Sequence, residues 1–142
     1  MIRFIGMVLV VIIAIMVLFL DKAKADVRIL IDISDQVMVV ETPNDRFIWP
    51  VSTGREGYNT PRGFYQPTRL VKMHYSKKYD NAPMPNSIFF HEGYAIHATY
   101  DVKRLGRPAS HGCVRLAPRD ARWLYQMVQD YGKDKTYIWV QD

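Results

Sequence analysis

The amino-acid sequence predicts a mostly β domain, a sandwich or barrel-like arrangement of strands with one short helix. Short runs of β-branched and aromatic residues recur along the chain, and turn residues separate them. Beyond residue 25, only one stretch places its apolar residues at helical spacing. The chain has 142 residues, which suffices for one hydrophobic core but not for two.

The first 25 residues differ from the rest and predict an export segment. Arg3 precedes an uncharged, strongly apolar run at 4–20, and Ala-Lys-Ala at 23–25 places small residues where a signal peptidase cuts. The run is slightly long for a signal core and barely long enough to span a bilayer. We therefore expect a signal peptide or an N-terminal membrane anchor over residues 1–25, and a domain at 26–142 in the periplasm or cell wall.

Strands are expected wherever β-branched and aromatic residues cluster. The expected strands cover residues 27–33, 36–42, 47–52, 64–65, 69–75, 87–90, 94–97 and 136–140. Residues 34–35 and 43–45 are turn signals, and residues 53–63 form a loop rich in glycine. Residues 76–86 are polar with two prolines, and they predict a surface loop.

The helix is expected over residues 118–131. Pro118 suits a first helical turn, and Gly132 suits the position just beyond the last turn. The apolar residues at helical spacing are Trp123, Leu124, Met127 and Val128.

The charge of the chain indicates which classes of partner it can bind. The formal net charge is +5, which favours anionic surroundings such as cell-wall polymers or lipid surfaces. Lysine and arginine form no dense stripe interleaved with aromatic residues, so we expect no nucleic-acid partner.

The single cysteine, Cys113, is the best candidate for a chemical role. A thiol needs a base or a positive charge nearby to become a good nucleophile. His111 is two residues away and cannot easily reach behind the sulfur, so we favour His97, which ends a predicted strand. Gly112 allows a sharp turn, and the N–H groups of Gly112 and Cys113, with His111 as a further donor, could hold a developing oxyanion.

Other interpretations of these residues remain open. Cys113 could be a small buried hydrophobe, as free cysteines often are. The spacing of the histidines and the cysteine matches none of the strong zinc patterns, so we expect no metal. His74 is expected to be a core histidine, whereas His91 could line a site or cap a strand.

The sequence resembles the catalytic domain of the L,D-transpeptidases, or YkuD-like domains. The resemblance rests on Ser-His-Gly-Cys-Val-Arg-Leu at 110–116 and Ala-Ile-His at 95–97. It extends to residues 51–54, 60–63 and 84–90, and covers essentially all of residues 27–140.

This resemblance implies a reaction on peptidoglycan. The Cys113 thiolate would attack the third residue of a tetrapeptide stem, release D-alanine and pass the acyl group to an amine. His97 would act as base and then acid, with its ring oriented by the carbonyl of Ala98. His111, Gly112 and Cys113 would form the oxyanion hole, and no cofactor is implied.

The resemblance also implies roles around the site and leaves the acceptor open. Ser110 would fix the loop, Arg115 could hold a stem-peptide carboxylate, and His91 could contact substrate. Many members have glycine or serine at Ala98 and asparagine at Arg115, so these positions depart from the common pattern. Water or the lysine of a wall-attached lipoprotein could replace the stem amine, and a wall-binding module with an idle thiol is the non-enzymatic alternative.

Overall fold

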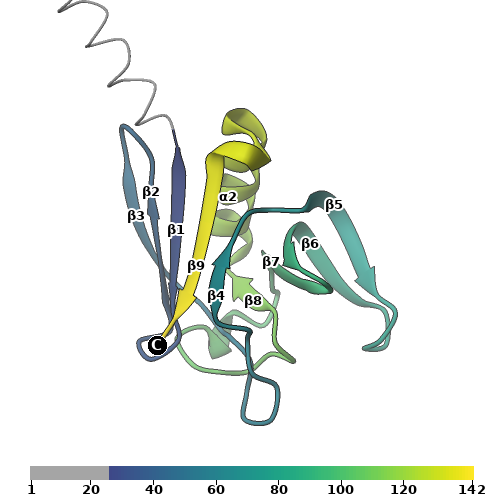
Figure 1. Cartoon of the computed structure of the whole chain (residues 1–142). Coiled ribbons are helices and arrows are strands. Elements are labelled where there is room, and N and C mark those ends of the chain that lie inside the picture. The colour runs from purple at the N-terminus through teal and green to yellow at the C-terminus, as the bar shows by residue number, and fades with distance from the viewer. Residues whose placement is uncertain (1–25) are drawn as a thin grey trace, which may run out of the picture.

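The computed structural model describes residues 26–142, so the predicted export segment lies outside the described residues. Two mixed β-sheets and one α-helix form the domain, which confirms the predicted fold class (Figure 1). The first sheet contains β1 (Val27–Asp32), β2 (Val37–Glu41), β3 (Arg46–Pro50), β4 (Gly63–Tyr65) and β9 (Thr136–Gln141). The second contains β5 (Arg69–Ser76), β6 (Ala82–His91), β7 (Tyr94–Ala98) and β8 (Val114–Leu116).

The five-stranded sheet has the order β3-β2-β1-β9-β4. β1 pairs with β2 in antiparallel register and with β9 in parallel register. Residues alternate along β1, with Val27, Ile29 and Ile31 buried in the core and the intervening residues facing outward.

The four-stranded sheet has the order β5-β6-β7-β8, and its β7–β8 pair is parallel. The helix α2 (Pro118–Tyr131) follows β8 directly and contacts β1, β6 and β7. The main core therefore lies between α2 and the inner faces of both sheets. Two short 3₁₀ helices, η1 (Val102–Arg104) and η2 (Lys133–Lys135), complete the elements.

The structure refines one element of the sequence analysis and corrects another. Trp123 shares the helical spacing of the apolar residues, but it is 58% exposed, and Ala121, Leu124, Tyr125 and Val128 form the buried side. The predicted loop at 76–86 is a tight turn, because β6 begins at Ala82 and includes both prolines. β7 does not reach this part of β6, and a strand tolerates proline where the nitrogen faces an open edge.

Within residues 26–142, no helix is long and apolar enough to cross a membrane. The same described residues contain no group of three or more histidine, cysteine or acidic side chains placed to hold a metal ion.

Candidate active site

The parallel pair β7–β8 brings His97 and Cys113 onto one face of the four-stranded sheet. Ile96 pairs with Val114 and His97 with Arg115, so Cys113, just before β8, lies beside Ala95. Directly paired residues of parallel strands point to the same face, and every second residue returns to that face. His97 and Cys113 are therefore diagonal neighbours on the face opposite the α2 side.

His97 is buried and its ring is held in one orientation. The ring Nδ1 lies 2.7 Å from the carbonyl oxygen of Ala98. A carbonyl only accepts hydrogen bonds, so Nδ1 carries the proton and Nε2 keeps its lone pair. Burial lowers the pKa of His97 to about 4, and the positive charge of Arg115 adds to that shift, while the Ala98 bond opposes it. The imidazole is thus neutral near pH 7 and can accept a proton.

The Cys113 thiol is partly buried and is not ionised at rest. Its side chain packs against a small cluster that includes Met84, Phe89 and Ala95. Burial raises the pKa of the Cys113 thiol, although a backbone hydrogen bond from Ala95 and the charge of Arg115 act in the opposite direction. A thiol with a raised pKa therefore lies beside an imidazole that is neutral near pH 7.

The loop before Cys113 is fixed by its own serine. The Ser110 hydroxyl donates to the carbonyl oxygen of Cys113 at 2.5 Å, and it accepts from the Gly112 N–H at 3.0 Å. This arrangement fits the loop-fixing role expected for Ser110. It also engages the Gly112 N–H inside the loop, so that group is not free as the oxyanion donor we expected.

Gly112 instead has a conformational role. Its φ is +121°, a region that other residues rarely adopt, and a Cβ atom there would lie 2.5 Å from the ring of Tyr94. Only glycine therefore allows the chain to make this turn beside the Tyr94 ring.

A buried threonine ties a second segment to this loop. The Thr60 hydroxyl donates to the Gly112 carbonyl at 2.8 Å and accepts from the Gly54 N–H at 3.0 Å. Gly54 is required, because a Cβ atom would lie 1.6 Å from the Tyr58 carbonyl oxygen.

The segment containing Ser52 and Thr53 runs alongside the nucleophile loop. Ser52 and Arg115 exchange two backbone hydrogen bonds of 2.9 and 3.1 Å. Thr53 accepts from the Ser110 N–H at 3.0 Å. The buried amide of Gln36 bonds both the backbone N–H and the hydroxyl of Thr53, so the turn between β1 and β2 supports the site from behind.

A cleft of about 390 Å³ lies next to β7 and β8. His97, His111 and Arg115 line it together with Arg55 and Arg104. Its one acidic lining residue is Asp101, which forms an ion pair with Arg104 at 3.2 Å. The cleft carries excess positive charge and suits a ligand with carboxylates.

His111, which lines this cleft, is held between two tyrosines. Its ring stacks on Tyr79, with centroids 4.0 Å and planes 6° apart, and Tyr58 meets it edge-on at 4.8 Å. Burial lowers the pKa of His111, and the charges of Arg55 and Arg115 lower it further. This contact joins the β5–β6 turn to the loop that carries the thiol.

Residues 26–138 match the family model described as the L,D-transpeptidase catalytic domain. The chain belongs to the L,D-transpeptidase (YkuD) family. A search of curated proteins found no match to the chain.

Solved structures of L,D-transpeptidases share the fold. The enzyme from Stackebrandtia nassauensis is 28% identical with a TM-score of 0.72, covering 84% of this chain and 57% of its own. The Mycobacterium smegmatis enzyme is 22% identical with a TM-score of 0.73, covering 83% and 59%. An L,D-transpeptidase solved in complex with imipenem is 19% identical with a TM-score of 0.71, covering 82% and 59%. This chain thus spans less than two thirds of the length of these neighbours.

For the other two histidines of this L,D-transpeptidase domain, the sequence predicts a core position for His74 and leaves two roles open for His91. His74 is only partly buried, packs edge-on against Phe89, and lies close enough to His97 to influence its pKa. His91 is not in the cleft lining: its ring contacts Tyr65 and Tyr94.

Several cleft residues escaped the sequence reasoning because they come from distant segments. Arg55 and Tyr79 lie in loops and Arg104 lies in η1, and no local pattern connects any of the three to Cys113. The residues that support the loop from outside the cleft lining, Ser52, Thr53 and Thr60, gave a signal through the runs at 51–54 and 60–63.

Proposed function

We propose that this domain is an exported, cysteine-dependent L,D-transpeptidase that acts on peptidoglycan stem peptides. The observation that carries the proposal is the pair formed by Cys113 and His97 on one sheet face, with the imidazole neutral and oriented by Ala98. Membership of the family supports the reaction class.

The neutral pair favours proton transfer during the attack. The sulfur of Cys113 forms a bond to the carbonyl carbon of the third stem residue while its proton moves to Nε2 of His97. The carbon–nitrogen bond to D-alanine then breaks, and His97 returns the proton to the leaving amine. The product is a thioester on Cys113. An incoming amine attacks this thioester, gives its proton to His97, and restores the thiol as the cross-link forms.

The oxyanion is assigned to the N–H of Cys113, with the His111 side chain as a further donor. Gly112 supports this arrangement by its backbone conformation, since its own N–H donates to Ser110. A comparable donor contributes about 3 kcal/mol to transition-state stabilisation.

The positive cleft suits the donor stem. A tetrapeptide stem ends in a free carboxylate, and Arg115 lies next to both the thiol and the imidazole. The planar guanidinium can bind a carboxylate with two parallel hydrogen bonds. We assign stem-carboxylate binding to Arg115, with Arg55 and Arg104 adding to the field.

The identity of the acceptor determines which of three products is formed from the thioester. A stem amine gives a cross-link, water gives a shortened stem, and the lysine of a lipoprotein gives a tethered protein.

A carbapenem should also react, as the imipenem complex of a structural neighbour suggests, since its strained amide offers a carbonyl to the thiol.

Purified tetrapeptide stems, incubated with and without an acceptor amine, test the proposal by mass spectrometry. We expect D-alanine release and a cross-linked dimer with the native protein, and neither product with Cys113→Ala. Equal release by that variant would overturn the proposal. Trimmed stems without dimers would identify water as the acceptor.

A further inference from the structure

The outer face of the five-stranded sheet carries an apolar row that crosses all five strands. Each member pairs in register with the next, so the side chains lie side by side on one face. The row consists of Ile48, Val39, Leu30, Trp139 and Phe64. Ile48, Trp139 and Phe64 are each more than half exposed.

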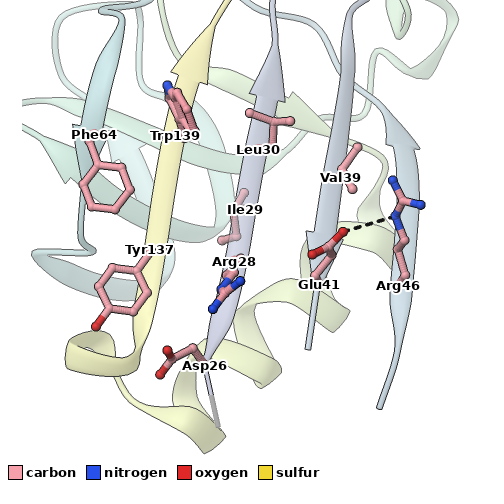
Figure 2. Close-up of a pocket in the computed structure, with 10 residues that line it drawn as sticks. All are labelled: Asp26, Arg28, Ile29, Leu30, Val39, Glu41, Arg46, Phe64, Tyr137 and Trp139. Atoms are coloured by element: carbon pink, nitrogen blue, oxygen red, sulfur yellow. Dashed lines mark ion pairs between the residues drawn. The ribbon is translucent and has the colours of Figure 1, made fainter. Parts of the chain in front are cut away.

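This face is hollowed and has aromatic walls. A groove of about 430 Å³ lies over it, which falls within the range of about 300–1,000 Å³ for ligand pockets. Figure 2 shows the rings of Phe64, Tyr137 and Trp139 gathered on one side of the groove. Phe64 and Tyr137 stack with centroids 6.0 Å apart. Exposed apolar patches rimmed by polar residues mark interaction sites and ligand-binding grooves.

The charged residues of the groove are balanced. Asp26 and Glu41 oppose Arg28 and Arg46, and Glu41 pairs with Arg46 at 3.4 Å (Figure 2). Binding to an anionic membrane requires a net positive surface. Asp26 and Glu41 cancel the positive charge of the two arginines, so the groove does not suit such a membrane. Uncharged hydroxyl and amide groups can bind both carboxylates and guanidinium groups.

We propose that this groove binds the glycan strand of peptidoglycan, a neutral-backbone polymer of β-linked sugars. Aromatic rings stack on the C–H faces of sugar rings, and flanking charged groups bind their hydroxyls. Neighbouring strands are about 4.8 Å apart, close to the length of one sugar ring in a β-1,4-linked chain. The row could therefore hold several consecutive rings. The choice of polymer rests on the proposed function.

Titration of the full chain with β-1,4-linked N-acetylglucosamine oligomers, and with glycan strands freed of their stems, tests this groove. We expect Trp139→Ala to weaken binding by about tenfold or more, and Trp139→Phe to restore most of it. Trp123→Ala is the matched control, because Trp123 is exposed to a similar extent, 58% against 53%, but lies on α2. Thermal unfolding of each variant verifies that the fold is retained.

Four results would overturn the proposal. One is no glycan binding by the native chain, and another is an equal loss of binding in the Trp139 and Trp123 variants. A change of oligomeric state in Trp139→Ala with glycan binding unaltered would identify a contact between copies. A loss of association with lipid vesicles in Trp139→Ala, again with glycan binding unaltered, would identify a membrane contact. D-alanine release from free stems, measured in parallel, reports on the proposed reaction independently of the groove.

Discussion

His97 and Arg115 stand directly opposite each other in the parallel pair β7–β8. Their side chains share one sheet face, so a permanent positive charge lies beside a buried imidazole. Burial is the larger cause of the low His97 pKa, and Arg115 is the first charged neighbour that adds to it. This relationship determines how the site responds to acid.

Activity is expected to remain high well below neutral pH. His97 serves as base only when neutral, and its pKa of about 4 leaves it neutral until the solution becomes strongly acidic. The acid limb of D-alanine release, measured as kcat/KM against pH, should therefore lie near pH 4. Arg115→Gln should move that limb to higher pH, because the repulsion that opposes protonation is removed. An acid limb at or above the ordinary histidine pKa of about 6.5 would contradict the neutral pair.

The same histidine should make the fold sensitive to acid. The folded chain holds His97 at a pKa of about 4, whereas the unfolded chain has a pKa near 6.5. Between these values the unfolded state binds more protons, so the free energy of unfolding falls as the pH is lowered. The loss from His97 approaches roughly 3 kcal/mol at the lower value. Denaturant unfolding at several pH values measures it, and His97→Gln should remove this part of the slope.

Thr60 should prove essential to the geometry of the nucleophile loop. Thr60→Val leaves the Gly112 carbonyl and the Gly54 N–H without their buried partner. Such a loss costs about 1–3 kcal/mol, so both unfolding stability and D-alanine release should fall. Thr60→Ser keeps the hydroxyl and should restore most of each. Thr42→Val is the control, since Thr42 bonds Asp45 in an exposed turn; an equal effect there would contradict the assignment.

A carbapenem should acylate Cys113. The sulfur adds to the β-lactam carbonyl and opens the ring, so nothing leaves and the protein gains the full mass of the drug. Intact-protein mass spectrometry should show one adduct on the native chain and none on Cys113→Ala. His97→Ala should form the adduct much more slowly, since no base takes the thiol proton. An unmodified native protein would count against the nucleophile.

The sequence predicted most strands and the helix because their patterns are local. The alternation in β1 and the proline and glycine at the ends of α2 can be found without knowing the partners. The exposure of Trp123 could not, because the direction in which the helix faces depends on sheets that are distant in sequence. The same limit applies to Arg55 and Tyr79, which reach the cleft only through pairings between separate segments.

The protonation state of the thiol and the hydrogen bonds of its loop could not be predicted from the sequence either. The motif at 110–116 indicated a nucleophile, but the protonation state of Cys113 depends on its burial against Met84 and Phe89. The use of the Gly112 N–H depends on the rotamer of Ser110. Neither the burial nor the rotamer follows from residue order.

The parallel pairing of β1 with β9 joins Val27 to Thr136, more than a hundred residues later. The central part of one sheet therefore cannot assemble until the final strand has been made. Contacts this distant in sequence slow folding, so the chain should remain unfolded through most of its synthesis. A domain exported as proposed would benefit from such a delay, because an unfolded chain can pass through a narrow translocation channel and a folded domain cannot.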